Sequence, residues 1–358
     1  LGVEVFFVIS GYLITLLLLT ESEKHGRINF RAFWMRRARR LLPAMWTLLL
    51  GVTIYCSLFE RAELGKLRGD VIAALIYVFN WFKIWAQSSY FDGTALDPLR
   101  HLWSLAVEEQ FYLLWPVVVI GLLAARRKYG HRFSKVLTWL IVLITIYATC
   151  RLFVWFSIDG PIVNSFSWFR PLMDRNISPE RLAFYSPLTR SWEFVAGVGV
   201  ALAVRATWVR KTERLGSCYW FAGAMLVAWA VRLASITPGY EHGPDTATNT
   251  TATMLAVLGT SLVLFGGEFG PLVSRALTVK PLTVIGDWSY SVYLWHWPIW
   301  VLLITTFNRG HQVTIAATVL SILFGWAQFR WIEKPIRDGS RLTRLSFGRM
   351  SSAFVVIA

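Results

Sequence analysis

The stretch Leu41–Phe59, LLPAMWTLLLGVTIYCSLF, has no charged residue along its whole length. A helix needs about 20 predominantly apolar residues to cross the hydrocarbon core of a bilayer, so this stretch predicts a transmembrane helix. The strongly basic segment Lys24–Arg40 precedes it directly. Because basic segments next to membrane helices remain in the cytoplasm, we expect the helix to run from the cytoplasm outward.

Similar apolar runs recur along all 358 residues of the chain, of which 55% are hydrophobic and only 16% charged. A soluble domain has about 25% charged residues and does not need such runs. The expected fold is therefore all-α, a polytopic transmembrane helical bundle of about ten spans with one short re-entrant or interfacial segment. The spans are predicted at Val5–Leu19, Leu41–Phe59, Leu105–Ala125, Val136–Phe156, Leu188–Val204, Gly216–Ala234, Ala252–Gly267, Leu282–Ile304, Val313–Trp331 and, as the start of a last one, Phe347–Ala358.

The short segment is Val71–Ala86, an apolar run interrupted by Asn80 and Lys83. The basic loops Lys24–Arg40 and Arg126–Arg132 require the chain to lie outside the membrane both before and after this segment. We therefore predict that it re-enters the membrane or lies at its interface, where half-spanning backbone is tolerated if protein buries it or it faces water. A slightly short full span is the alternative.

The net charge of +15 lies mainly in short loops between the apolar runs. This distribution is typical of the cytoplasmic loops of membrane proteins, and no nucleic-acid-binding fold accompanies it, so we expect no nucleic-acid partner. Cys56, Cys150 and Cys218 lie in or beside apolar runs, and their spacing fits neither a disulfide framework nor a metal site. We expect no bound metal.

Two neighbouring carboxylates, Glu108 and Glu109, open the span at Leu105–Ala125, and Tyr112 follows one turn later. At this helical spacing Tyr112 shares a face with either carboxylate. A carboxylate beside a phenol in a site of low dielectric can transfer protons, so all three are candidate catalytic residues. The alternative is a pair of interfacial acids that favour the helix dipole. His101, in the preceding loop, could line the same outer opening.

Arg190 and Glu193 are three residues apart near the outer end of a predicted span, and we expect them to form an ion pair. They are candidate catalytic residues because ionisable groups inside a membrane are costly and mark function by default; a purely structural pair is the alternative. His296 lies near the middle of Leu282–Ile304, two residues before Pro298, which should kink the helix. It is a further catalytic candidate, and a satisfied structural histidine is the alternative.

Six motifs follow one another in order along nearly the whole chain, and together they resemble the acyltransferase 3 family of membrane O-acyltransferases. The motifs are GVEVFFVISGYLI at Gly2–Ile14, RRARRLLPA at Arg36–Ala44, HLWSLAVEEQFY at His101–Tyr112, YSPLTRSWEF at Tyr185–Phe194, SYSVYLWHWP at Ser289–Pro298 and EKP at Glu333–Pro335. One of them alone would be a weak signal, whereas their common order is a strong one.

The resemblance implies a multi-pass protein of the cell membrane that moves an acyl group, with acetyl expected, from cytoplasmic acyl-CoA to a hydroxyl of an extracytoplasmic glycan or lipid-linked sugar. Acetyl-CoA is the expected donor substrate, and no permanently bound cofactor is expected. Arg36, Arg37, Arg39 and Arg40 are the candidate donor-binding residues, because arginine binds phosphate bidentately. Simple topogenic charge is the alternative for these arginines.

In the family, the principal catalytic histidine belongs to a first helix that would precede Leu1, so the resemblance implies that this histidine lies outside the present sequence. We expect an acyltransferase 3-like transmembrane domain at residues 1–346 and the start of a further helix at residues 347–358. Some family members carry an extracytoplasmic SGNH-type domain after such a helix.

Two other functions are compatible with the hydropathy. A transporter or flippase for a lipid-linked glycan or an acyl donor is the main alternative, and a non-catalytic membrane scaffold is a third. The order of the motifs favours the enzyme, since a transporter would show internal repeats with matched broken helices, and buried ionisable residues disfavour a scaffold. The sequence does not identify the acceptor or the acyl group.

Overall fold

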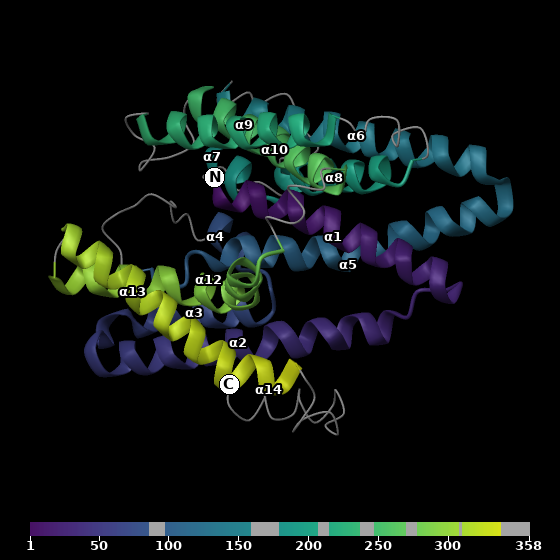
Figure 1. Ribbon diagram of the computed structural model, residues 1–358. Helices are drawn as coiled ribbons and strands as arrows, with labels where there is room; N and C mark the ends of the chain where they lie inside the picture. The colour runs from purple at the N-terminus through teal and green to yellow at the C-terminus, as the bar shows by residue number, and fades with distance from the viewer. Residues whose placement is uncertain are drawn as a thin grey trace. The chain divides into compact units, whose positions relative to one another are not determined.

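The structure is a computed structural model that describes residues 1–85, 97–158, 179–206, 215–236, 247–269, 278–307 and 310–337. Across these ranges all regular structure is helical, which confirms the predicted all-α class. The elements follow in chain order (Figure 1): α1 (Gly2–His25), α2 (Phe30–Phe59), η1 (Arg61–Glu63), α3 (Leu64–Leu75), α4 (Phe79–Trp85), α5 (Leu102–Tyr129), α6 (His131–Ile158), α7 (Pro179–Tyr185), α8 (Pro187–Val204), α9 (Gly216–Ile236), α10 (Ala247–Phe269), α12 (Lys280–Phe307), α13 (His311–Gln328), η4 (Phe329–Glu333) and α14 (Lys334–Arg337).

Within the described residues, 7 helices are long and apolar enough to cross a membrane: α1, α2, α5, α6, α9, α10 and the run from α13 to α14. The spans predicted at Leu188–Val204 and Leu282–Ile304 form α8 and α12, which are not among them. The chain is thus a multi-pass membrane protein, while the larger predicted number of spans is not confirmed. The last span, expected from Phe347 onward, lies outside the described residues.

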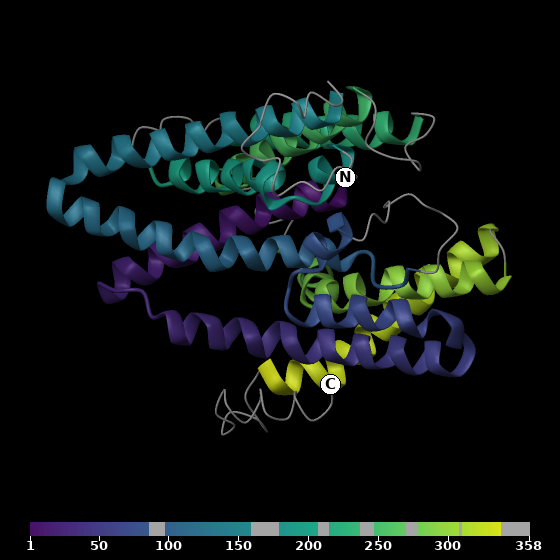
Figure 2. The same ribbon diagram turned by 180° about the vertical axis from the view of Figure 1, so that it is seen from behind.

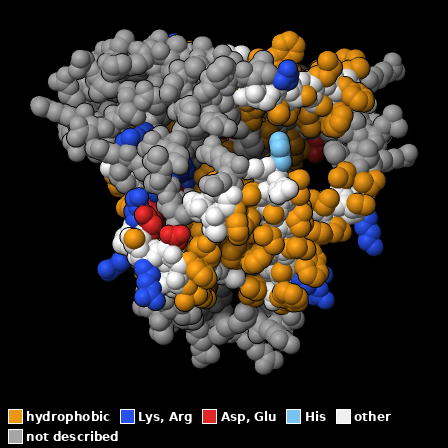
Figure 3. Space-filling view, turned by 90° about the vertical axis from the view of Figure 1, so that its left-hand side faces the viewer, with side chains coloured by type: hydrophobic (Ala, Val, Ile, Leu, Met, Phe, Trp, Pro, Cys, Tyr) orange, Lys and Arg blue, Asp and Glu red, His pale blue; other side chains and the backbone are white. Residues whose placement is uncertain are grey.

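Apolar side chains on the outside of the helices fit a lipid environment. On α9, Phe221, Met225 and Trp229 follow one another at helical spacing and are 60%, 73% and 65% exposed. On α6, Ile144 and Tyr147 are similarly exposed. Hydrophobic side chains also cover much of the described surface in Figure 3. Such large exposed apolar areas are rare on soluble monomers and are expected where a helix faces lipid.

The chain divides into two compact units that alternate along the sequence. The first unit comprises residues 1–28, 73–93 and 102–278, and the second comprises residues 29–72, 94–101 and 279–358. The transmembrane domain expected at residues 1–346 therefore contains parts of both units. Each unit has its own packed helices and its own set of polar contacts.

In the first unit, α5 and α6 form a long hairpin that turns at Gly130, where φ is +89° (Figure 2). α1 runs in the same direction as α5. The indole of Trp115 donates to the Thr15 hydroxyl at 2.9 Å. Further along both helices, Arg127 donates to the Gly26 carbonyl at 2.7 Å. The predicted alternation of spans requires this common direction, since both helices are expected to run inward.

α1 and α8 approach each other so closely that their backbones touch. A Cβ added at Gly11 would lie 1.9 Å from the Phe194 carbonyl oxygen, and one at Gly197 would lie 1.9 Å from the Val8 carbonyl oxygen. Small residues at such crossings let membrane helices pack backbone against backbone. The crossing brings the polar N-terminal turns of both helices together.

The segment predicted at Val71–Ala86 is not one continuous helix, because the chain breaks between α3 and α4 at Tyr77, whose φ is +55°. Gln110 of α5 holds the break, since its Nε2 donates to the Tyr77 carbonyl (2.8 Å) and to Asn80 Oδ1 (2.9 Å). Its Oε1 accepts from the Trp81 indole at 3.2 Å. A positive φ at a bulky residue is strained and persists only where its surroundings enforce it. The position of this broken segment relative to the bilayer stays a prediction.

In the second unit, α2 and α12 pack side by side and run in the same direction. The Tyr290 hydroxyl donates to the Leu41 carbonyl at 3.1 Å. Further along both helices, a Cβ added at Gly51 would lie 2.8 Å from the Trp295 ring. α13 packs against α12 and continues into η4, a π-helical turn that also contacts α2. The common direction of α2 and α12 again agrees with the predicted alternation.

Candidate active site

Glu108 and Glu109 lie inside the first unit and not at a solvated helix end. They are 4% and 8% exposed, and α5 begins at Leu102, more than one turn before them. The Ser10 hydroxyl of α1 donates to Glu108 Oε1 at 2.7 Å. The alternative of two interfacial acids does not fit this burial. Tyr112 is also buried, and a proton-transfer role for these three residues stays a prediction.

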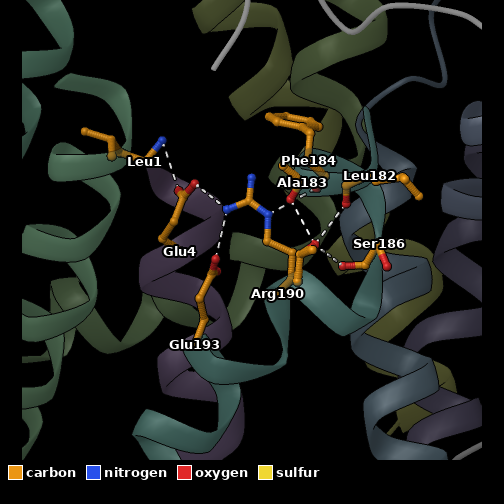
Figure 4. A network of polar contacts seen from close by, with 9 residues as sticks. Leu1, Glu4, Leu182, Ala183, Phe184, Ser186, Arg190 and Glu193 are labelled. Atoms are coloured by element: carbon orange, nitrogen blue, oxygen red, sulfur yellow. Dashed lines mark hydrogen bonds and ion pairs between the residues drawn. The ribbon is translucent and has the colours of Figure 1, made fainter. Parts of the chain in front are cut away.

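Arg190 and Glu193 form the predicted ion pair, and a second carboxylate joins them. Arg190 Nη1 lies 2.8 Å from Glu193 Oε1 and 3.4 Å from Glu4 Oε1 (Figure 4). Arg190 Nε donates to the Phe184 carbonyl at 3.1 Å. The Leu1 amino group lies 3.2 Å from the second oxygen of Glu4. The guanidinium is thus held from three directions by groups of α1, α7 and α8.

This cluster is almost completely shielded from solvent. Arg190 is 2% exposed, Glu193 is 0% exposed and Glu4 is 7% exposed. The guanidinium also lies over the rings of Trp103 and Phe184, at 5.8 Å and 5.2 Å from their centroids, where exclusion of water strengthens the cation–π attraction. Among the described residues no group hydrogen-bonds to Glu193 Oε2, so this oxygen can accept one more hydrogen bond.

The sequence reasoning missed two features of this unit, namely the ion pair of Glu4 and a polar contact of Tyr12. The Tyr12 hydroxyl of α1 donates to Glu268 near the end of α10. Both Glu4 and Tyr12 interrupt an apolar run, which is a readable signal, because polar residues at membrane depth are candidates by default. Their partners lie 186 and 256 positions away and are beyond the reach of local spacing.

In the second unit, His296 of α12 is one of two neighbouring histidines. Its ring centroid lies 5.4 Å from that of His101, and the ring planes meet at 78°. His101 is 4% exposed, whereas His296 is partly exposed. The His296 ring is therefore partly accessible, whereas the His101 ring that packs against it is buried within the unit. The sequence had pointed to each histidine separately and not to their contact.

The four candidate donor-binding arginines lie in the N-terminal part of α2. Asn29 directly precedes the helix, and its side chain caps α2 by accepting a hydrogen bond from the Ala32 backbone N–H at 3.0 Å. Arg36 and Arg40 are exposed, and Arg37 and Arg39 are partly buried. The Nε of Arg39 is buried and bonds to no group among the described residues. This end of α2 therefore offers several cationic hydrogen-bond donors to an anion.

Glu333 belonged to a sequence motif to which no role had been given. It lies in η4 and is 0% exposed, and the Ser291 hydroxyl of α12 donates to its Oε2 at 2.9 Å. Gln328 continues this network by donating to the Ser291 hydroxyl at 3.3 Å and accepting from the Trp295 indole at 2.7 Å. π-helical turns are frequent at functional sites. Two motifs whose residues stand 42 positions apart thus meet in one buried polar cluster.

Comparison with known proteins identifies similar chains. A family model described as an acyltransferase domain matches residues 1–329. The chain is 31% identical over 347 residues to the peptidoglycan O-acetyltransferase OatA of Listeria monocytogenes. It is 30% identical over 349 residues to the putative peptidoglycan O-acetyltransferase YrhL of Bacillus subtilis and 30% identical over 365 residues to the O-acetyltransferase OatA of Staphylococcus aureus.

Each of these alignments covers 94% of the present chain but only 51%, 50% and 52% of the respective relative. The chain therefore spans about half the length of the curated relatives that it matches. No solved structure matches the chain.

Proposed function

This chain belongs to the acyltransferase family whose model matches residues 1–329, and on that premise we propose that it is a membrane-embedded O-acetyltransferase that acts on hydroxyl groups of a cell-wall glycan. The names of the three relatives support acetyl as the transferred group, and two of these names support peptidoglycan as the acceptor. The multi-pass fold supports a reaction between partners on opposite sides of a membrane.

Acetyl-CoA is the proposed donor, and the arginine-rich end of α2 is its proposed binding site. CoA carries phosphate groups, and guanidinium groups bind phosphate through two parallel hydrogen bonds. The buried and unpaired Nε of Arg39 is one donor for such a contact. The exposed Arg36 and Arg40 provide charge on the same helix end. The predicted topology puts this end in the cytoplasm, where acetyl-CoA is found.

One observation carries the proposal: within the second unit, α12 packs against the arginine-rich end of α2 and also carries His296. Tyr290 of α12 contacts the backbone of Leu41, directly after the arginines. His296 follows six residues later, which corresponds to about 9 Å along a helix axis. Both helices are expected to run outward. A donor at the arginines would thus lie on the cytoplasmic side of a residue type that suits acyl transfer.

The test uses the full-length protein, purified in lipid nanodiscs that leave both faces accessible. Isotope-labelled acetyl-CoA and a soluble muropeptide are supplied, and acetyl esters on the glycan are measured by mass spectrometry. We expect transfer by the wild type. The double variant Arg36→Gln/Arg39→Gln should raise the KM for acetyl-CoA roughly 10-fold or more, because each charge-assisted hydrogen bond contributes about 1.5–3 kcal/mol.

The matched control is Arg61→Gln, since Arg61 is exposed in η1 and lies on the expected outer side. It should leave the KM for acetyl-CoA unchanged. Absence of glycan acetylation by the wild type would overturn the proposed function. Normal transfer by the wild type with an unchanged KM in the double variant would overturn the donor site alone.

A further inference from the structure

The carboxylate of Glu333 has one oxygen held by the protein and one oxygen left open. Oε2 accepts from the Ser291 hydroxyl at 2.9 Å, and this hydroxyl accepts in turn from Gln328 at 3.3 Å. These bonds fix the orientation of the carboxylate. Oε1 is buried as well, yet no group among the described residues hydrogen-bonds to it. A buried carboxylate oxygen without a donor is costly, so Oε1 is suited to accept an N–H or O–H of a bound molecule.

The packing of α13 on α12 determines where this carboxylate lies. A Cβ added at Gly325 of α13 would lie 2.7 Å from the Cα atom of Val292, so the two helices touch backbone to backbone directly beside Ser291. From there α13 continues into the π-helical turn η4, and Glu333 is the last residue of that turn. Such turns are frequent at functional sites. The open oxygen is therefore held in place by rigid neighbours.

The same turn lies against α2, the helix of the proposed donor site. Both η4 and α14 contact α2, and Figure 2 shows α14 beside it. The charge of Arg40 in α2 acts on the Glu333 carboxylate. One residue earlier, the buried Nε of Arg39 also bonds to no group among the described residues. An open hydrogen-bond donor and an open acceptor thus occur on two elements that touch.

The charged groups that act on Glu333 include accessible ones. Arg40 and Arg337 attract its carboxylate, and Asp287 repels it. Arg40 is exposed. Arg337 pairs with Asp287 at 3.5 Å, and the side chains of this pair are 33% and 54% exposed. Because exposed ion pairs are weak, a ligand that binds the arginines can displace this pair at little cost.

A carboxylate beside phosphate-binding arginines restricts which ligands fit. A ligand that offers only phosphate meets the like charge of Glu333 and leaves Oε1 without a donor. A ligand that carries both phosphate and N–H groups satisfies the arginines and the carboxylate together. CoA is of the second kind, since it has phosphates, the amino group of adenine and the amides of its pantetheine arm. Sites that hold a buried acceptor discriminate strongly against ligands that lack the matching donor.

We propose that Glu333 is a specificity-determining residue of the donor site, whose Oε1 accepts a hydrogen bond from an N–H group of CoA while the arginines of α2 bind the CoA phosphates. The inference rests on the donor site given under the proposed function and deepens it by naming what distinguishes CoA from other phosphate compounds. Ser291 and Gln328 hold the carboxylate in the accepting orientation. Free polyphosphate is disfavoured by the same charge.

The test measures binding to the full-length protein in nanodiscs, by displacing isotope-labelled acetyl-CoA with CoA or with pyrophosphate, which has no N–H group. Glu333→Gln should lower the affinity for CoA about 10-fold or more, the effect of losing a hydrogen bond to a charged group. The amide oxygen keeps the bond from Ser291, and its NH2 group then replaces Oε1 and cannot accept. The affinity for pyrophosphate should rise, because a repelling charge is gone. A purely structural role would not move the two affinities in opposite directions.

Two further variants separate the hydrogen bond from the charge. Glu333→Asp keeps the charge but draws the oxygens back, so CoA should bind more weakly and pyrophosphate as in the wild type. This variant carries the test if Glu333→Gln does not fold. Asp287→Asn is the matched control, since it removes a carboxylate that is exposed but acts on the same surroundings. It should leave both affinities unchanged or raise both.

Two fragments of CoA show which N–H group is the partner. Adenosine 3′,5′-bisphosphate carries the adenine amino group, and phosphopantetheine carries the amides. The fragment with the partner group should lose affinity in Glu333→Gln, and the other should not. An affinity for CoA in Glu333→Gln and Glu333→Asp equal to or above that of the wild type would overturn this inference. A wild type that binds acetyl-CoA but transfers no acetyl group would instead overturn the proposed function, and one that binds no acetyl-CoA would overturn the donor site and this inference together.

Discussion

Arg190 carries a positive charge into a part of the first unit where its side chain is 2% exposed. Two carboxylates of α1 and α8, one backbone carbonyl and two aromatic rings surround it. Attraction in such a setting must offset the cost of removing three charged groups from water. The balance is therefore sensitive to the loss of one member, and the loss of the guanidinium, which pairs with both carboxylates, is the most severe change.

Replacing Arg190 by methionine should destabilise the protein by about 3–5 kcal/mol, because it leaves the Glu193 carboxylate buried without its counter-charge and removes the guanidinium that Glu4 shares with it. The measurement is the apparent melting temperature of the purified protein in detergent, together with its yield. Arg205→Met is the control, since the side chains of Arg205 and Glu23 are 29% and 67% exposed and a pair of this kind contributes at most about 1 kcal/mol. Equal losses in both variants would contradict the structural importance of the buried cluster.

For individual side chains, the sequence predicted the contacts inside one helix and missed the contacts between helices. The pairing of Arg190 with Glu193 follows from their spacing of three residues, which helix geometry brings together wherever the helix lies. Glu4 joins the pair only because α1 crosses α8, and no pattern in either helix states its partner. The contact between His101 and His296 likewise depends on how α12 packs against the loop that carries His101.

Two glycines determine how closely α1 and α8 approach. A Cβ at Gly11 or Gly197 would collide with backbone atoms of the other helix. No flexible side chain lies at these two contacts that could move aside. The two helices would have to separate to admit even one methyl group. Since the Arg190 cluster joins the same two helices, its geometry depends on this crossing.

Gly11→Ala should therefore lower the apparent melting temperature by an amount that corresponds to about 1–3 kcal/mol or more, the cost of forcing extra volume into a packed interior. The matched substitution is Gly121→Ala in α5, where a Cβ would meet nothing within 4 Å. That variant should be neutral or gain up to about 1 kcal/mol, since alanine is the better helix former. A stable Gly11→Ala protein would show that the two helices do not pack as the structure describes.

The long helices could be predicted from apolar runs and charge, because length and hydropathy alone determine whether a segment can cross a bilayer. Irregular elements could be predicted only in part. Asn80 and Lys83 indicated that the segment from Val71 is not an ordinary span, yet the break at Tyr77 is held by Gln110, 33 positions away. The π-helical turn at Phe329–Glu333 had no local signal at all.

For the whole molecule, charge asymmetry predicted the direction of each span before any packing was known. Two helix pairs support this alternation independently. α1 and α5 run in the same direction in the first unit, and α2 and α12 do so in the second. The alternation requires both results, since an odd number of expected spans lies between the members of each pair: α2 between α1 and α5, and α5, α6, α8, α9 and α10 between α2 and α12. The remaining question at this scale is which side of the membrane each loop faces.

The native cysteines provide a test of that topology. Cys218 is exposed near the start of α9, just after the basic segment expected in the cytoplasm, while Cys56 is buried in α2. A membrane-impermeant maleimide should label the protein in inside-out vesicles and not in right-side-out vesicles, and Cys218→Ser should abolish this labelling. In that background, Arg61→Cys in η1 should be labelled only in right-side-out vesicles. Labelling of both positions from one side would mean that the chain crosses the membrane an even number of times between α2 and α9, contrary to the charge-based alternation.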